Sequence, residues 1–188
     1  MRLFKVLFLS IIAFSCSNGE EFNQQTGNLN ILKGYEKLVY SRPQDVLDSL
    51  SWVVSEFKEK SEYSAYSALL YSIAFEQKYG TLRIDSIINK SAQWYSIGED
   101  YSNRCRSMLY KSIALYSLNR VDSNAYLTIK EAESLYKKID VENNHIGATL
   151  FLYLGRMNRA RSQAGVAEEY LKKSLELSSL ANYRTGVL

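Results

Sequence analysis

The chain has 188 residues, of which 46% are hydrophobic and 23% charged, enough for one folded body with a sizeable core or for a short repeat array. Two of its 23 basic residues and none of its 20 acidic ones fall within positions 1–15, so the charge without that segment is near +1. The basic balance therefore gives no support to a nucleic-acid partner, and we expect none. One proline and nine glycines predict long helices, and no long β-branched alternation indicates a sheet.

Residues 1–15 have the pattern of an export signal. Two basic residues precede an apolar run at 6–14, which is shorter than the roughly 20 residues that cross a bilayer. The run ends at Ala13-Phe14-Ser15-Cys16, which looks like a bacterial lipoprotein cleavage box, and Cys16 is expected to carry the lipid. Ordinary signal-peptidase cleavage and a buried N-terminal helix are the alternatives. Residues 16–28 are polar and are expected to form a flexible tether.

From Leu29 onward, apolar residues recur at helical spacing. Pro43 is placed to begin a second helix, and Gly80 to close a third. Asp85 and Asp122, each followed by serine, are predicted to cap the fourth and sixth helices. The pattern predicts eight helices in four antiparallel pairs. Residues 183–188 resemble the start of a ninth helix that is cut off, as in a truncated product, a fragment or an array completed by a partner.

Two segments of the chain share one internal spacing. In the segment 148–181, Gly155 and Ala167 carry little or no side chain, so two helices can approach closely there while larger neighbours fill the seam. In the segment 106–139, Ile113 and Ala125 are separated by the same twelve residues, and Ala125 lies 42 residues before Ala167. An interval that recurs at two places favours a helical array over a single bundle.

The later copy resembles the tetratricopeptide repeat, whose signature is W-x2-L-G-x2-Y followed by A-x3-F. Phe151 stands for the Trp, Leu154-Gly155 match, Ala167 matches and Leu171 replaces the Phe, whereas Asn158 departs from the Tyr. Over residues 29–188 the chain resembles tetratricopeptide-repeat lipoproteins of the Bacteroidales type. The resemblance implies an all-α solenoid of about four antiparallel helix pairs, wound as a right-handed superhelix. It also implies a lipoprotein anchored in the periplasm or on the cell surface of a Gram-negative bacterium.

Reactive side chains are scarce. His145 is the only histidine and is expected to lie solvated at the exposed start of a helix. One histidine and one usable cysteine, Cys105, cannot form a metal cluster, and a buried helical cysteine is typically a small core residue. There is no phosphate-binding glycine loop. We therefore expect a protein that is not an enzyme and has neither cofactor nor metal.

A binding surface is the remaining expectation. In repeat arrays the first helix of each pair lines a concave groove. The groove positions predicted on the last two pairs are Thr149, Leu152, Arg156 and Arg159, and Ser107, Tyr110, Ala114 and Ser117. Two of these arginines lie three residues apart on one helix face and could hold a carboxylate or phosphate bidentately. We predict a peptide-binding surface made by Arg156, Arg159, Tyr110 and Leu152.

These features favour a lipid-anchored helical-repeat scaffold that binds another protein or peptide outside the cytoplasm. One alternative is a glycan-capture surface lipoprotein, in which some of the fifteen tyrosines would stack on sugars. Another is a sensor fragment of a membrane regulator that contains tetratricopeptide repeats.

Overall fold

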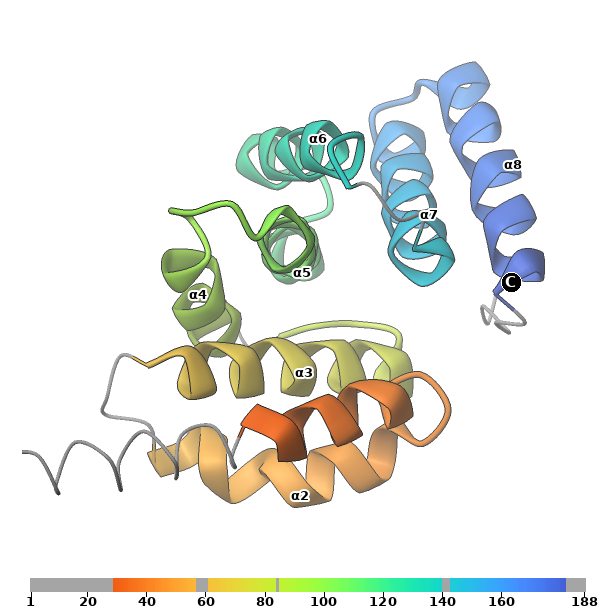
Figure 1. The fold of residues 1–188 in the computed structure, drawn as a ribbon. Coiled ribbons are helices and arrows are strands. Elements are labelled where there is room, and N and C mark those ends of the chain that lie inside the picture. The colour runs from red at the N-terminus through yellow and green to blue at the C-terminus, as the bar shows by residue number, and fades with distance from the viewer. Residues whose placement is uncertain (1–28, 57–60, 84, 140–142, 182–188) are drawn as a thin grey trace, which may run out of the picture.

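A computed structural model describes residues 29–56, 61–83, 85–139 and 143–181 (Figure 1). These residues form helices and turns and contain no strand, which confirms the all-α prediction. A helical segment at 29–38 precedes seven helices: α2 (Pro43–Glu56), α3 (Glu62–Tyr79), α4 (Asp85–Trp94), α5 (Tyr101–Leu118), α6 (Ser123–Tyr136), α7 (Asn144–Ala160) and α8 (Ala164–Leu180). The predicted signal at 1–15, the tether at 16–28 with Cys16, and the start of a ninth helix at 183–188 lie outside the described residues.

The helices pack as neighbours along the chain, most closely α5 with α6 and α7 with α8 (Figure 1). The first helices of successive pairs also touch, α3 with α5 and α5 with α7. Adding 42 to the bounds of α5 gives 143–160, which differs by one residue from the bounds of α7 (Asn144–Ala160). The predicted adjacent helix pairs are therefore present. None of the described helices is both long enough and apolar enough to cross a bilayer.

The helix ends follow the local sequence. α2 begins at Pro43 as predicted. Gly80 takes a left-handed conformation with φ 65°, and its N–H donates to the carbonyl of Glu76 at 2.7 Å, which ends α3. Asp122 caps α6, since its side chain accepts a hydrogen bond of 3.0 Å from the N–H of Ala125. The other predicted cap, Asp85, is the first residue of α4.

Small residues bring the paired helices together where the spacing predicted. A Cβ atom on Gly155 would lie 2.7 Å from Cγ of Leu171 and 3.3 Å from the carbonyl oxygen of Ala167, so α7 and α8 meet there nearly backbone to backbone. In the preceding pair, Cys105 is buried and its thiol donates to the carbonyl of Ala132 at 3.3 Å. Burial raises the pKa of this thiol to about 12, as suits the predicted core residue.

A buried polar network fixes the helical segment at 29–38 to later helices. Arg106 on α5 is only 4% exposed, and its Nη1 donates to Glu36 Oε1 at 2.5 Å and to Asn103 Oδ1 at 3.1 Å. The Tyr66 hydroxyl on α3 donates to the other oxygen of Glu36 at 2.5 Å. One carboxylate therefore links the first helical segment to both α3 and α5.

The turn at residues 39–41 also contacts the start of α7. The ring of Tyr40 stacks on His145, with centroids 4.2 Å apart and planes 8° from parallel. The expectation of a solvated histidine is wrong: His145 is half-buried, and burial lowers the pKa of its imidazole. His145 does lie at the start of a helix, as predicted, because it is the second residue of α7.

Candidate functional site

A cavity of about 830 Å³ lies where the ends of three helices meet. Residues that follow α3, the last turn of α5 and the second half of α7 line it: Gly80, Thr81, Arg83, Tyr116, Ser117, Arg120, Tyr153, Arg156, Arg159 and Ala160. Four of these are arginines and none is acidic. We call this hollow the arginine cavity.

The segment after α3 is held in place by its own backbone. The left-handed Gly80 turns the chain out of the helix. Leu82 is then fully buried, and its N–H donates to the hydroxyl of Ser117 on α5 at 3.2 Å. Thr81 and Arg83, on either side of Leu82, both line the cavity.

The aromatic floor of the cavity orients one arginine. Tyr153 is buried, and its hydroxyl donates to Oε1 of Glu76 at 2.9 Å. Tyr116 packs edge-on against the Tyr153 ring, with centroids 6.0 Å apart. The guanidinium carbon of Arg156 lies 5.0 Å from the centroid of the same ring, within the range of a cation–π contact. Arg156 is therefore partly ordered before any ligand arrives.

The positive charge of the cavity is only partly balanced from within. Glu76 is the nearest acid behind the floor; burial raises its pKa, although the hydrogen bond from Tyr153 and the charge of Arg156 oppose that shift. Three helix C-termini contribute about half a negative charge each. Within the described residues, no carboxylate lies at ion-pair distance from the four lining arginines. About +4 from the arginines, against roughly −1.5 from the helix ends and at most −1 from Glu76, leaves a positive site suited to an anion.

The structure separates the four predicted site residues. Arg156 and Arg159 line the arginine cavity. Leu152 lies in a different hollow, a groove between α7 and α8 that Arg159 also borders. Tyr110 is 1% exposed and belongs to the core. Of the other predicted groove positions only Ser117 reaches the cavity, whereas three are buried: Ser107, Ala114 and Thr149.

The correction for Tyr110 has a physical reason. Its face of α5 is covered, because α5 contacts α3, α4, α6 and α7, and Arg106 on the same helix binds Glu36 of the first helical segment. The prediction assumed that this face of α5 is open, but other helices cover it. The surface that a ligand can reach lies instead where the ends of α3, α5 and α7 meet.

Sequence reasoning missed Arg83 and Arg120. A signal for them exists, since each of three successive first helices has an arginine at or just after its C-terminus: Arg83 after α3, Arg120 after α5 and Arg159 in the last turn of α7. Cations at such positions complement the helix dipole, so each alone is unremarkable. Their convergence on one cavity follows only when the three ends lie together.

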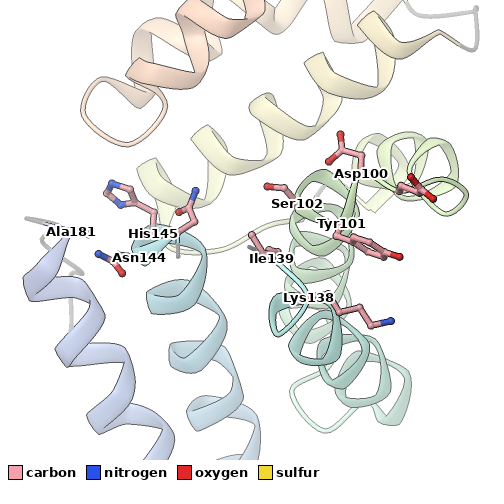
Figure 2. A pocket seen from close by; sticks show the side chains of 10 residues that line it. Asp100, Tyr101, Ser102, Lys138, Ile139, Asn144, His145 and Ala181 are labelled. Atoms are coloured by element: carbon pink, nitrogen blue, oxygen red, sulfur yellow. The ribbon is translucent and has the colours of Figure 1, made fainter. Parts of the chain in front are cut away.

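A second hollow, of about 610 Å³, lies at the N-terminal ends of α5 and α7, beside residues that follow α6 and α8 (Figure 2). Figure 2 shows Asp100, Tyr101 and Lys138 on one side of it and Asn144 and His145 on the other. The carboxylate of Asp100 is already used, because it accepts hydrogen bonds of 2.9 Å from both the backbone and the side chain of Asn103. Its mixed charge and the engaged carboxylate of Asp100 make this hollow the weaker candidate.

Neither a metal site nor a known relative points to a function for the described residues. In the part of the chain that the structure describes, no group of three or more His, Cys, Asp or Glu side chains could hold a metal ion. Comparisons with protein-family models, with curated proteins and with solved structures find no match.

Proposed function

We propose that this chain is a helical-repeat scaffold of the tetratricopeptide type that binds an acidic segment of another protein in the arginine cavity. A lipid on Cys16 would hold it at a membrane, outside the cytoplasm. The observation that carries the proposal is the convergence of four guanidinium groups on one cavity that has no acidic side chain in its lining. No catalytic group is assigned, and the scaffold acts by binding alone.

The chemistry of the cavity favours carboxylates as ligands. Guanidinium groups bind carboxylates through paired, charge-assisted hydrogen bonds, each of which contributes about 1.5–3 kcal/mol. Arg156 is held against Tyr153, whereas Arg83, Arg120 and Arg159 are exposed and can adjust to the ligand. A segment with two or three acidic residues could therefore engage several of them together.

Glycan capture has less support. A sugar site needs an aromatic face that a ring can reach. Tyr110, at a predicted groove position, and Tyr153, in the cavity lining, are both 1% exposed. The cavity does expose arginine side chains, and these suit an anionic ligand.

The binding test uses calorimetry with a synthetic glutamate-rich peptide. The double variant Arg120→Gln/Arg156→Gln should weaken peptide binding at least about tenfold, because it removes two charged donors. The control Lys33→Gln/Lys37→Gln removes the same charge from two exposed lysines outside the cavity and should change binding little. Circular dichroism confirms that both variants are folded. Equal weakening by the two variants would contradict the proposal, since it would mean that the peptide senses only net charge.

A further inference from the structure

The groove between α7 and α8 is the second feature with unexplained chemistry. Its volume is about 450 Å³, and it lies beside the arginine cavity, which it meets at Arg159. Apolar side chains from both helices line it, including Leu152, Leu171 and Leu175. Leu175 is 64% exposed and adjoins the other leucines of this groove.

The 42-residue interval between the two helix pairs relates this groove to an equivalent surface on α5 and α6. Moving back by 42 residues, Leu152 maps to Tyr110, Leu171 to Ile129 and Leu175 to Glu133. Tyr110 and Ile129 are fully buried, and they lie on the α5–α6 pair, against which α7 packs. The open groove on α7–α8 is therefore the counterpart of a covered groove one pair earlier.

Contacts in the covered groove show how a helix is held there. Arg161, just after α7, donates to the carbonyl of Asp122 at 2.8 Å and lies 4.4 Å from the centroid of the Tyr126 ring. Tyr170 on α8 donates to Glu133 at 3.1 Å. These three contacted positions of α6 map to Ala164, Glu168 and Leu175, and all three line the open groove. At these three positions the lining of the open groove is equivalent to a surface that contacts α8 and the residue just after α7.

We propose that this groove is a docking site for an amphipathic helix of a partner protein that carries acidic residues along one flank. The groove supplies leucines for the apolar face of the helix and Arg159 at its border for the acidic flank. Glu168 pairs with Lys172 at 2.7 Å and leaves Arg159 as the uncompensated charge on this border. The partner helix would run beside α8 as α7 runs beside α6.

Charge argues against a second copy as the occupant. Head-to-tail stacking would bring the first helical segment of one copy, at 29–38, onto the α7–α8 groove of the next. That segment exposes Lys33 and Lys37, whose charge has the same sign as the uncompensated Arg159. Like charges in such an interface oppose association.

The test uses fluorescence anisotropy with a labelled 17-residue helical peptide, the length of α7, with leucines at helical spacing and glutamates along one flank. The peptide should bind the full chain, and Leu175→Gln should weaken binding at least about tenfold. The matched control is Leu127→Gln, because Leu127 on α6 is 66% exposed and lies outside the groove. A peptide with the same residues in scrambled order should bind poorly.

Other outcomes would overturn the docking proposal. They are equal loss in the Leu175 and Leu127 variants, equal binding of the scrambled peptide, or dimerisation in the ultracentrifuge that Leu175→Gln abolishes. Binding seen only after removal of residues 182–188 would assign the groove to this chain's own end. The Arg120→Gln/Arg156→Gln variant separates the two proposals, since it should lose the glutamate-rich peptide in the arginine cavity and keep the helical peptide.

Discussion

Replacement of Gly155 by alanine tests the close contact between α7 and α8. The added Cβ would lie 2.7 Å from Cγ and Cδ2 of Leu171 and 3.3 Å from the carbonyl oxygen of Ala167. Such overpacking costs about 1–3 kcal/mol, whereas the better helix propensity of alanine returns about 1 kcal/mol. The free energy of unfolding should therefore fall by up to about 2 kcal/mol.

Gly34→Ala is the matched control. Gly34 also lies within a helical segment, but a Cβ there would meet nothing within 4 Å. This substitution should raise the free energy of unfolding by about 1 kcal/mol through propensity alone. The two variants should thus differ by about 1–3 kcal/mol in urea unfolding followed by circular dichroism.

A double-mutant cycle assigns the clash to a single neighbour. In a Leu171→Ala background the two atoms at 2.7 Å are gone and only the Ala167 carbonyl oxygen at 3.3 Å stays close, so Gly155→Ala should be less destabilising than in the wild type. If Gly155→Ala is as stabilising as Gly34→Ala in the wild-type background, the two helices do not meet at this point, and the reasoning from small residues is refuted.

Three further predictions concern the buried network, the cavity floor and the N-terminus. Glu36→Gln should lower the free energy of unfolding by about 3 kcal/mol, because it leaves the buried Arg106 without its carboxylate, whereas Glu131→Gln, at a solvent-accessible ion pair, should cost less than about 1 kcal/mol in the same urea titration. Burial raises the pKa of Glu76 above its ordinary value of about 4.5, so its contribution to stability is complete below that pH and is lost as pH rises through the folded-state pKa. Urea midpoints of the wild type should therefore fall with rising pH relative to Glu76→Gln, and parallel curves would contradict this. Cys16→Ala should release the protein from the membrane fraction and reduce its mass by the lipid; an unchanged fraction and mass would remove the anchor from the proposal.

The parts of the fold that depend on neighbouring residues could be predicted from the sequence. Helical spacing places Gly155 and Ala167 on facing sides of two helices, and a proline or an aspartate marks a helix start through its own backbone chemistry, as at Pro43 and Asp122. These features need no knowledge of distant contacts. The all-α class and the adjacent helix pairs follow from them.

The candidate site could be predicted only in part. Arg156 and Arg159 share one helix, so their spacing placed them together, whereas Arg83 and Arg120 join them only because three helix ends meet. The burial of Tyr110 follows from the packing of four other helices against α5, to which the first helical segment also returns through Glu36, 70 residues before Arg106. A pattern read over one or two helices contains no information on such a contact.

The arginine cavity is tested most directly in native membranes by photo-crosslinking. A benzophenone amino acid at position 120, on the cavity lining, is compared with the same residue at position 33, outside it. The account predicts a protein adduct from position 120 and none from position 33. The adduct should be attached to an acidic segment of the partner, and it should disappear when Arg156 is replaced by glutamine. An adduct that persists in the Arg156→Gln protein, or forms equally from both positions, would contradict the account.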